Sequence, residues 1–207
     1  MQIEKFQLIL GSQSPRRKEL LQYTYLPFQI EVFPIEETSS KVDQAEVVMD
    51  LAEQKAQVVF DQIKEKYSNP IVLGADTIVC LDEKILGKPA DDKEASEMLM
   101  SLSGRSHDVL TGICLLSKKK KSCFYEKTKV TFEKIDHDLL AHYISTQESL
   151  DKAGAYGIQA YSLGFIKSVS GSYSNVVGLP VNLVIKKIKD FLEQSEDTEG
   201  RWRKYFE

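Results

Sequence analysis

The alternation of apolar and polar positions predicts strands and helices that alternate along the first third of the chain. The apolar run 6–10 ends at Gly11 and predicts a buried strand that leads directly into a helix beginning at Ser14 and Pro15. Serine is a favourable N-cap, and proline fits the first helical position because its missing N–H is not needed there. An alternating strand is expected at 28–33 and a long helix at 43–66. This order is typical of an α/β fold.

Longer strands are expected in the middle of the chain. Segment 70–80 is almost continuously apolar, as in strands buried on both faces, and 81–86 predicts a hairpin return. After a helix at 91–100, segment 107–135 predicts two long strands around a turn at 117–122. The four lysines at 118–121 are expected to form a solvated turn. The fold class is therefore expected to be mixed α/β, with long strands and peripheral helices.

The last third of the chain predicts two more helices and a tail. Asp136 caps a helix, and a glycine-rich stretch then leads to a last helix at 180–193. The tail 195–207 has no clean apolar face. It is either mobile or docks through Trp202, Tyr205 and Phe206. We therefore expect one domain over 1–194, followed by this tail.

Composition excludes several classes of protein. Among 207 residues the net charge is −4, so no overall basic bias points to nucleic acid. No apolar run approaches the roughly 20 residues that span a membrane. Three widely spaced cysteines, Cys80, Cys114 and Cys123, form no metal-ligand pattern. Their odd number and the lack of a signal peptide favour free thiols in the cytoplasm.

The first charge anomaly is at the start of the predicted helix at Ser14. Its first turn holds Arg16, Arg17 and Lys18, although a helix N-terminus already carries about half a positive charge. A bound anion resolves the conflict, because backbone N–H groups, the helix dipole and two guanidinium groups would converge on it. The alternative is that the arginines turn outward into solvent.

Two further charges lie at apolar positions. Lys55 falls in the middle of the apolar face of the helix 43–66, where it either extends its ammonium group to solvent or delivers it into a cleft. Asp76 interrupts the apolar strand 70–80, where a carboxylate is costly unless it is paired or binds a metal. Gly74 indicates a close backbone approach beside Asp76, and Lys88 follows on a turn.

Paired carboxylates suggest metal-assisted chemistry on a polyphosphate. Glu36 and Glu37 follow the second strand, although a solvated loop is the simpler interpretation for Glu36. Together with Asp76 and the basic residues, they suit Mg²⁺ or Mn²⁺ bridging carboxylate and phosphate oxygens. The three histidines form no Ser–His–Asp pattern, and the chain has no GxxxxGK[ST] motif, which argues against a P-loop enzyme.

Taken together, these segments resemble the Maf family of nucleoside triphosphate pyrophosphatases over nearly the whole chain. The motifs that carry the resemblance follow in the family's order: GSQSPRRKELL, IEET, LAEQKA, GADTIV, GKP, LSGRSHDVLTG, DKAGAYGIQA and IKSVSGSYSNVVGLPV. The IEET segment departs from the family's usual I-D-E, so that Glu37 matches the family glutamate. Ala160 stands where the family usually has glycine.

The resemblance implies hydrolysis between the α- and β-phosphates of dTTP or UTP, which gives the monophosphate and pyrophosphate. It also implies an elongated α/β domain with a mixed central sheet flanked by helices, and two lobes around a nucleotide cleft. Dimers are common in the family, so a homodimer is an expectation. The implied roles are proton acceptor for Asp76; base specificity for Arg16, Thr77 and Gln159; phosphate or nucleotide contact for Ser12, Arg17, Lys55 and Lys88; and metal association for Glu37 and Asp76.

Two alternatives remain open on the sequence alone. One is a non-enzymatic nucleotide-binding regulator of cell division and septum formation. The other is a house-cleaning enzyme for purine analogues such as inosine triphosphate, on a related fold. Keeping Asp76, Lys55 and Lys88 together favours an enzyme, because a protein that only binds nucleotides does not need a base.

Overall fold

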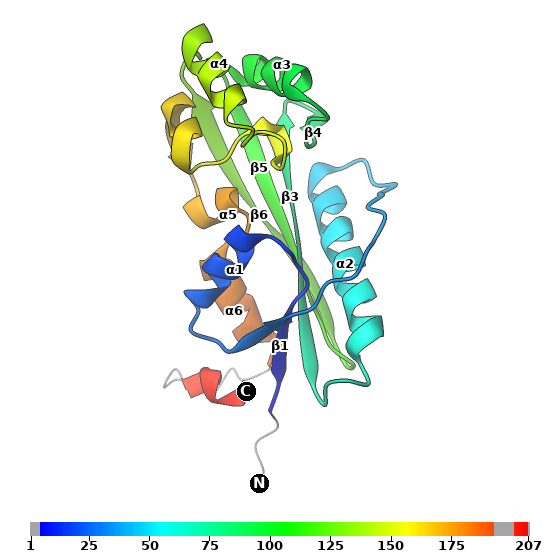
Figure 1. The fold of residues 1–207 in the computed structure, drawn as a ribbon. Helices are drawn as coiled ribbons and strands as arrows, with labels where there is room; N and C mark the ends of the chain where they lie inside the picture. Colours follow the sequence, from blue (N-terminus) through cyan, green and yellow to red (C-terminus); the bar gives the residue numbers. More distant parts are fainter. Residues whose placement is uncertain (1–4, 193–200, 207) are drawn as a thin grey trace. The chain divides into compact units, whose positions relative to one another are not determined.

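The computed structural model describes residues 5–192 and 201–206 of the chain. Figure 1 shows its helices and strands along the chain. The helices are Pro15–Gln22 (α1), Gln44–Ile63 (α2), Asp92–Leu102 (α3), His137–Ser145 (α4), Tyr173–Val177 (α5) and Val181–Phe191 (α6), with 3-10 turns at Ala153–Ala155 (η1), Ala160–Phe165 (η2) and Arg201–Tyr205 (η3). The strands are Gln7–Leu10 (β1), Phe28–Ile30 (β2), Pro70–Leu81 (β3), Lys84–Leu86 (β4), Ser106–Leu116 (β5), Lys121–Phe132 (β6) and Ile166–Ser170 (β7).

The strands of the described residues form one mixed sheet in the order β2-β1-β3-β5-β6-β7, with β4 paired to β3. Strand β1 pairs in parallel with both β2 and β3. Strand β4 returns antiparallel along β3, and β7 runs antiparallel to β6. This mixed sheet with its helices confirms the expected fold class. The expected nucleotide cleft stays a prediction.

The chain divides into two compact units. The first holds the residues up to Asp76, the hairpin tip Gly112–Tyr125 and the residues from Gly178 onward. The second holds Thr77–Thr111 and Glu126–Val177. Strands β3, β5 and β6 each contribute residues to both units, and the division of β3 falls directly after Asp76.

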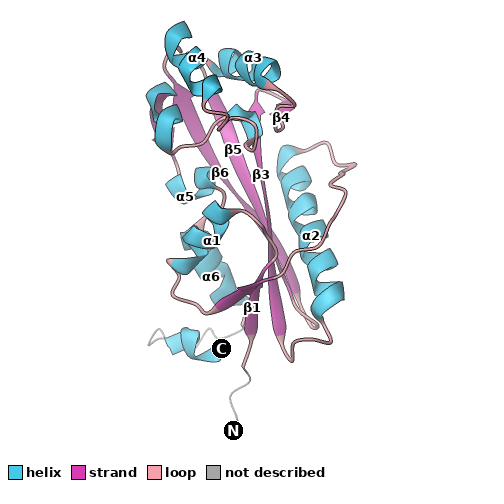
Figure 2. Cartoon of the chain, viewed as in Figure 1, coloured by secondary structure: helices cyan, strands magenta, loops and turns pink. Residues whose placement is uncertain are grey.

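In the first unit, α2 covers one face of the strands, and α1 and α6 cover the other (Figures 1 and 2). Asp43 caps α2 by accepting hydrogen bonds from the backbone N–H groups of Ala45 and Glu46. The apolar stripe of α2 is buried against the sheet. The core cluster under α2 comprises Ile9, Ala52, Ala56, Val59, Phe60, Ile63, Tyr67, Val72, Cys114 and Leu116.

In the second unit, α3 and α4 contact each other and share an apolar core with the strands. Asp91 caps α3 by accepting from the backbone N–H of Glu94. The largest side chains that are fully buried in this core are aromatic: Tyr143, Phe132 and Phe165. This unit therefore has a core of its own.

Most predicted elements are present, with local differences. Strand β3 is buried along its whole length except at Thr77, as expected for a strand covered on both faces. The strand predicted at 28–33 is shorter and ends at Ile30. The prediction that the lysines at 118–121 form a solvated turn is wrong in part. Lys120 donates to the carbonyls of Asp190 and Phe191, and Lys121 pairs with Glu53. Strand β7 in the glycine-rich stretch is not predicted.

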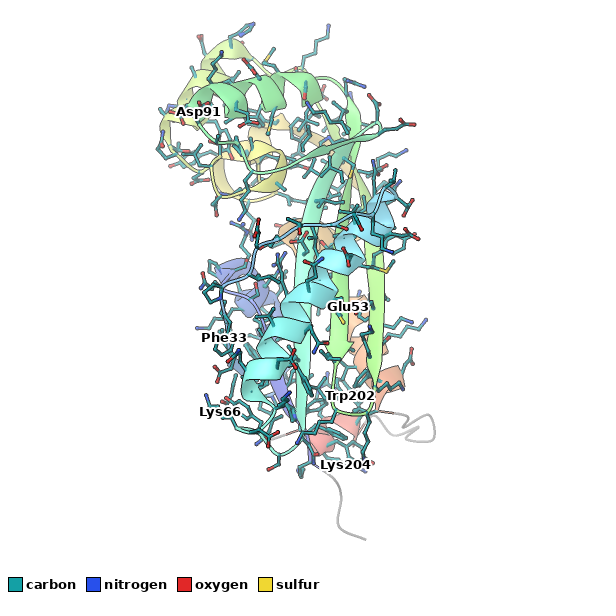
Figure 3. The ribbon with its side chains drawn as sticks, turned by 90° about the vertical axis from the view of Figure 1, so that its right-hand side faces the viewer. Phe33, Glu53, Lys66, Asp91, Trp202 and Lys204 are labelled. Atoms are coloured by element: carbon teal, nitrogen blue, oxygen red, sulfur yellow. The ribbon has the colours of Figure 1, made fainter. Side chains whose placement is uncertain are left out.

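The described part of the C-terminal tail contacts the first unit. Trp202 and Phe206, two of the three aromatic residues considered for docking, are buried. The backbone N–H of Phe6 donates to the carbonyl of Tyr205 at 2.7 Å. Figure 3 labels Trp202 in this part of the tail. Residues 195–200 and 207 of the predicted tail lie outside the described residues.

No helix in the described part of the chain combines the length and the apolar character that crossing a membrane requires.

Candidate active site

The turn between β1 and α1 is held by two serine hydroxyls. Ser14 is the N-cap of α1, and its side chain accepts from the backbone N–H of Arg17 at 3.4 Å. Ser12 is buried, and its hydroxyl oxygen accepts from the backbone N–H of Ser14 at 3.3 Å. These bonds fix the N-terminus of α1 in place, and the first turn contains no acidic residue.

Arg17 folds back over this turn. Its Nη1 donates to Ser12 Oγ at 3.3 Å, and its Nε donates to the carbonyl of Gly178 at 2.9 Å. Burial lowers the pKa of Arg17, and the nearby carboxylate of Asp76 partly offsets this effect. Arginine nonetheless remains charged in proteins. The interpretation that the arginines turn outward is therefore wrong for Arg17, which presents a fixed cation at the helix N-terminus.

Lys55, Asp76 and Glu37 form a charged cluster. The Nζ of Lys55 lies 2.6 Å from Oδ1 of Asp76 and 2.8 Å from Oε2 of Glu37. The Lys55 and Asp76 side chains are only 15% and 11% exposed, whereas Glu37 is 46% exposed. Of the two alternatives for Lys55, a lysine that extends to solvent is therefore wrong: its ammonium group is delivered to two carboxylates.

Close packing of α2 on β3 brings Lys55 to Asp76. A Cβ added at Gly74 would lie 2.4 Å from the carbonyl oxygen of Ala52 and 2.8 Å from the Cβ of Ala56. A side chain there would force the helix or the strand to move. The expected close approach at Gly74 is confirmed. It brings the part of α2 that carries Lys55 against β3, where Asp76 lies two residues beyond Gly74.

Side chains of α2 also hold the loop that carries Glu37. Gln54 donates through Nε2 to the carbonyl of Thr38 at 2.8 Å, and Ser39 donates to Asp50 at 2.5 Å. Glu37 therefore reaches Lys55 from a loop that α2 anchors at the two residues directly after Glu37. Glu36 is exposed, in agreement with the simpler interpretation of a solvated loop.

The carboxylate cluster has few ligands of its own for a metal. Among the described residues, no group of three or more His, Cys, Asp or Glu side chains gathers where it could hold a metal ion. The two carboxylates of Glu37 and Asp76 nevertheless meet at one ammonium group. Two carboxylates fit the way Mg²⁺ is bound in nucleotide enzymes, through one or two carboxylates together with substrate phosphates.

Three predicted residues belong to the second unit: Thr77, Lys88 and Gln159. Thr77 Oγ1 lies 3.0 Å from Thr111 Oγ1, and Thr111 donates to the carbonyl of Asn175 at 2.9 Å. Lys88 and Gln159 are exposed. The side chain of Ala160, the departure from the family pattern, lies outside what the structure describes.

Sequence reasoning does not single out Thr111 and Asn175, which support Thr77. Asn175 is fully buried, and its Nδ2 donates to the carbonyl of Val109 and to Thr128 Oγ1, each at 3.0 Å. Both residues lie within motifs that carry the family resemblance, LSGRSHDVLTG and IKSVSGSYSNVVGLPV, but the sequence pattern does not indicate that they meet. Gly178 lies in the second of these motifs, but its contact with Arg17 is made by its backbone carbonyl, which residue type does not predict.

Comparison with known proteins shows which family the chain resembles. The sequence profile of the family described as "Maf-like protein" matches residues 7–191. A protein of Bacillus cytotoxicus named dTTP/UTP pyrophosphatase is 48% identical over 184 residues, which are 88% of this chain and 94% of that protein. A protein of Bacillus mycoides with the same name is 46% identical over 185 residues, 89% of this chain and 95% of that protein.

Among solved structures, a HAM1 protein from Coxiella burnetii has a similar fold. Its TM-score is 0.50 at 14% identity, and the match covers 89% of this chain and 99% of that one. At this identity the likeness concerns the fold alone.

Proposed function

The chain belongs to the Maf family, and from this premise we propose that it hydrolyses the bond between the α- and β-phosphates of dTTP and UTP, releasing the nucleoside monophosphate and pyrophosphate. The observation that carries the proposal is the cluster of Lys55, Glu37 and Asp76 in the same compact unit as the Ser12–Arg17 turn. The relatives named dTTP/UTP pyrophosphatase support the substrate and the bond that is cleaved.

The Ser12–Arg17 turn binds the phosphates in this proposal. The N-terminus of α1 presents its dipole and backbone N–H groups, and Arg17 adds a guanidinium group fixed by Ser12 and Gly178. A donor that is already in position loses little entropy when a phosphate binds. Lys55 and Lys88 complete the set of expected phosphate contacts.

Asp76 is the proposed general base. Its carboxylate is largely buried and accepts a hydrogen bond from Lys55, so that its position is fixed. It takes a proton from water as the water oxygen attacks phosphorus. The bond between the α- and β-phosphates breaks, and pyrophosphate leaves. Cationic groups that face the phosphates stabilise the charge developing there, which is the main contribution to such reactions.

A divalent cation, Mg²⁺ or Mn²⁺, would be held by Glu37 and Asp76 together with the phosphates. When bound, it neutralises phosphate charge and makes the bound water more acidic. Without it, the two carboxylates share the charge of Lys55.

Base selection is assigned to Arg16, Thr77 and Gln159. Thr77 follows Asp76 directly on β3. The residue assigned to nucleobase selection is therefore the chain neighbour of the proposed general base. The contact of Thr77 with Thr111 orients its hydroxyl group.

A panel of nucleotides tests the proposal. The protein is incubated with dTTP, UTP, the other common triphosphates and ITP, with Mg²⁺ or Mn²⁺, and pyrophosphate and orthophosphate are measured separately. We expect pyrophosphate, with dTTP and UTP cleaved fastest. Pyrophosphate mainly from ITP would indicate the purine house-cleaning alternative. Orthophosphate alone would indicate cleavage of the terminal phosphate, and nucleotide binding without either product would favour the septum-formation regulator.

The Asp76→Asn variant assigns the base. General-base catalysis contributes about 10²- to 10⁴-fold, and kcat should fall by that factor while the fold is retained. Asp61→Asn, on the exposed side of α2, is the matched control and should keep normal turnover. A near-normal kcat in Asp76→Asn contradicts the base assignment.

We propose in addition a cytoplasmic enzyme that acts as a homodimer and has a house-cleaning role. The free thiols support the compartment, and the family resemblance supports the dimer and the house-cleaning role. None of the expected partners is a nucleic acid or a membrane. Cell fractionation tests the compartment, and light scattering of the purified protein tests the dimer.

A further inference from the structure

Two of the three cysteines face each other across the β5–β6 hairpin. Cys114 Sγ and Cys123 Sγ are 3.0 Å apart, and both thiols are free. Cys114 lies in the core cluster beneath α2, and Cys123 packs against the edge of that cluster. Neither thiol is used by the proposed pyrophosphatase chemistry.

The hairpin register explains why the two sulfur atoms meet. The turn closes where the N–H of Ser117 donates to the carbonyl of Lys120 at 2.9 Å. Three residues further along each antiparallel strand are Cys114 and Cys123, which are therefore cross-strand partners on one face of the sheet. The hydroxyls of Ser106 and Thr131, 2.8 Å apart, follow the same register further along the strands. The contact is thus built into the strand pairing.

The two thiols differ in access. Cys114 is completely buried, whereas Cys123 is partly exposed. Cys123 Sγ also lies 3.6 Å from Oε2 of Glu53 on α2, whose other carboxylate oxygen pairs with Lys121. Figure 3 labels Glu53 on α2. Cys123 is therefore the thiol that a small solute reaches first.

The protonation behaviour of the thiols agrees with this difference. The hydrogen bond between the two sulfur atoms lowers the pKa of Cys123 and raises that of Cys114. In contrast, burial raises the pKa of Cys80 to about 11, and this third thiol lies in the second unit. Because the thiolate is the reactive form, Cys80 serves as an internal unreactive comparison.

We propose that Cys114 and Cys123 form a peroxide-reactive dithiol site that closes to an intrachain disulfide, with Cys123 as the thiol that the peroxide oxidises and Cys114 as the resolving thiol. The oxidant is a small hydroperoxide such as hydrogen peroxide. The reductant that reopens the site is a low-molecular-weight or protein dithiol.

The chemistry takes two steps. The Cys123 thiolate attacks one peroxide oxygen; an S–O bond forms, the O–O bond breaks, and hydroxide leaves to take up a proton as water. Cys114 then attacks the sulfur of the Cys123 sulfenic acid; the S–S bond forms, the S–O bond breaks, and the thiol proton leaves with the hydroxyl group as a second water. One peroxide is reduced to two waters, and two thiols are oxidised to one disulfide.

The fold accommodates the product with little movement. A disulfide bond is about 2.05 Å long, so the two sulfur atoms must approach by about 1 Å. Neighbouring strands already hold paired Cα atoms within the range of about 4.4–6.8 Å that a disulfide needs. In a reducing compartment the thiols remain reduced at rest, and the disulfide forms only during oxidant exposure.

Peptide mapping of the whole chain tests the site directly. The protein is treated with hydrogen peroxide, blocked with an alkylating agent and digested with trypsin without reduction. Lysines 118–121 lie between the two cysteines, so trypsin separates peptide 106–118 from peptide 122–127 unless a disulfide joins them. We expect the joined pair of peptides, alkylated Cys80, a monomeric chain on non-reducing gels, and full reversal by dithiothreitol.

Single serine substitutions separate the roles of the two thiols. Cys114→Ser should leave Cys123 as a sulfenic acid that a dimedone probe labels, because the resolving thiol is gone. Cys123→Ser should abolish both dimedone labelling and disulfide formation, and Cys80→Ser should behave like the original chain.

Several results would overturn the assignment. They are oxidation of Cys80 as fast as that of Cys123, a disulfide that joins two chains in place of the intrachain bond, or irreversible oxidation of Cys123 with Cys114 present. Unchanged thiols at peroxide concentrations that oxidise free cysteine would do the same. These readouts follow the thiols alone, so the inference stands or falls independently of the nucleotide chemistry.

Discussion

The ammonium nitrogen of Lys55 lies 2.6 Å from Oδ1 of Asp76, and the two side chains come from a helix and a strand that each place a charge at an otherwise apolar position. Neither charge is stable there alone, because a buried unpaired charge is costly. The pair therefore explains two sequence anomalies with one contact.

Removing the cation of this pair should affect both stability and turnover. Lys55→Met keeps the length of the side chain but removes the ammonium group that pairs with the carboxylates of Asp76 and Glu37. We expect a loss of about 1–3 kcal/mol in the free energy of unfolding, because a largely buried carboxylate loses its partner. Turnover should fall about 100-fold, as expected for a misplaced catalytic group. Urea denaturation and steady-state kinetics measure the two effects.

The control for this variant is Lys64→Met on the same helix. The Lys64 side chain is 45% exposed, and its ammonium lies 3.5 Å from Asp61. Exposed pairs of this kind contribute little, about 0–1 kcal/mol. If Lys55→Met and Lys64→Met had the same small effect on turnover, the Lys55–Asp76 contact would not position the base.

Gly74→Ala should separate α2 from β3. The added methyl group would lie 2.4 Å from the backbone oxygen of Ala52, which cannot move without the helix. We expect a destabilisation of about 1–3 kcal/mol from overpacking, and a large loss of kcat because Asp76 is only two residues away. Gly87→Ala, where the methyl group would meet nothing within 4 Å, should change neither quantity. Thermal unfolding measures the change in stability of both variants, and steady-state kinetics measures the change in kcat.

The sequence is sufficient to predict which residues are unusual in the first unit. A charge on an apolar face, a cationic helix start and a glycine before a buried carboxylate point to Lys55, Arg17 and Asp76, and the structure brings all three into one unit. The burial cost of a charge is a property of the residue and its neighbours in the chain, so a pattern can reveal it.

The partners of these residues are not predictable in the same way. Arg17 donates to the carbonyl of Gly178, 161 residues away, and Glu37 is placed by side chains of α2 that hold its loop. Strand β7 is another example, since only two of its five residues are partly buried and it exists through its pairing with β6. Such contacts depend on tertiary structure, which periodicity does not encode.

The guanidinium fork of Arg17 should be needed for nucleotide binding. Arg17→Lys keeps the charge but cannot donate to both Ser12 and Gly178 while facing a phosphate. We expect KM for dTTP to rise by roughly ten- to a hundredfold, with a smaller change in kcat. Lys18→Ala, an exposed cation in the same helical turn, is the control and should leave KM unchanged. Equal effects of the two variants would mean that only the overall charge of the turn matters.

His107 in the second unit provides a test that concerns folding alone. The residue is 3% exposed, its Nε2 lies 2.6 Å from the hydroxyl oxygen of Tyr156, and its ring and that of Phe132 meet edge to face at a centroid distance of 4.9 Å. Among the described residues, its buried Nδ1 has no hydrogen-bond partner, so a second ring proton would have no acceptor. Burial lowers the pKa of His107 to about 4, although Asp108 opposes the shift.

This shift predicts a loss of stability in mild acid. In the unfolded chain a histidine has a pKa of about 6.5, so between pH 6.5 and about 4 the unfolded chain binds a proton that the folded chain does not. The contribution is complete above pH 6.5 and decreases as the pH falls toward 4, by up to about 3 kcal/mol. His107→Phe removes the titrating group, so its free energy of unfolding should change less between pH 7 and pH 4.5, even if it is lower throughout. His137→Gln, at an exposed histidine, should retain the full pH dependence, and urea denaturation at several pH values compares the three slopes. The same slope in His107→Phe as in the original chain would show that other groups cause the acid sensitivity.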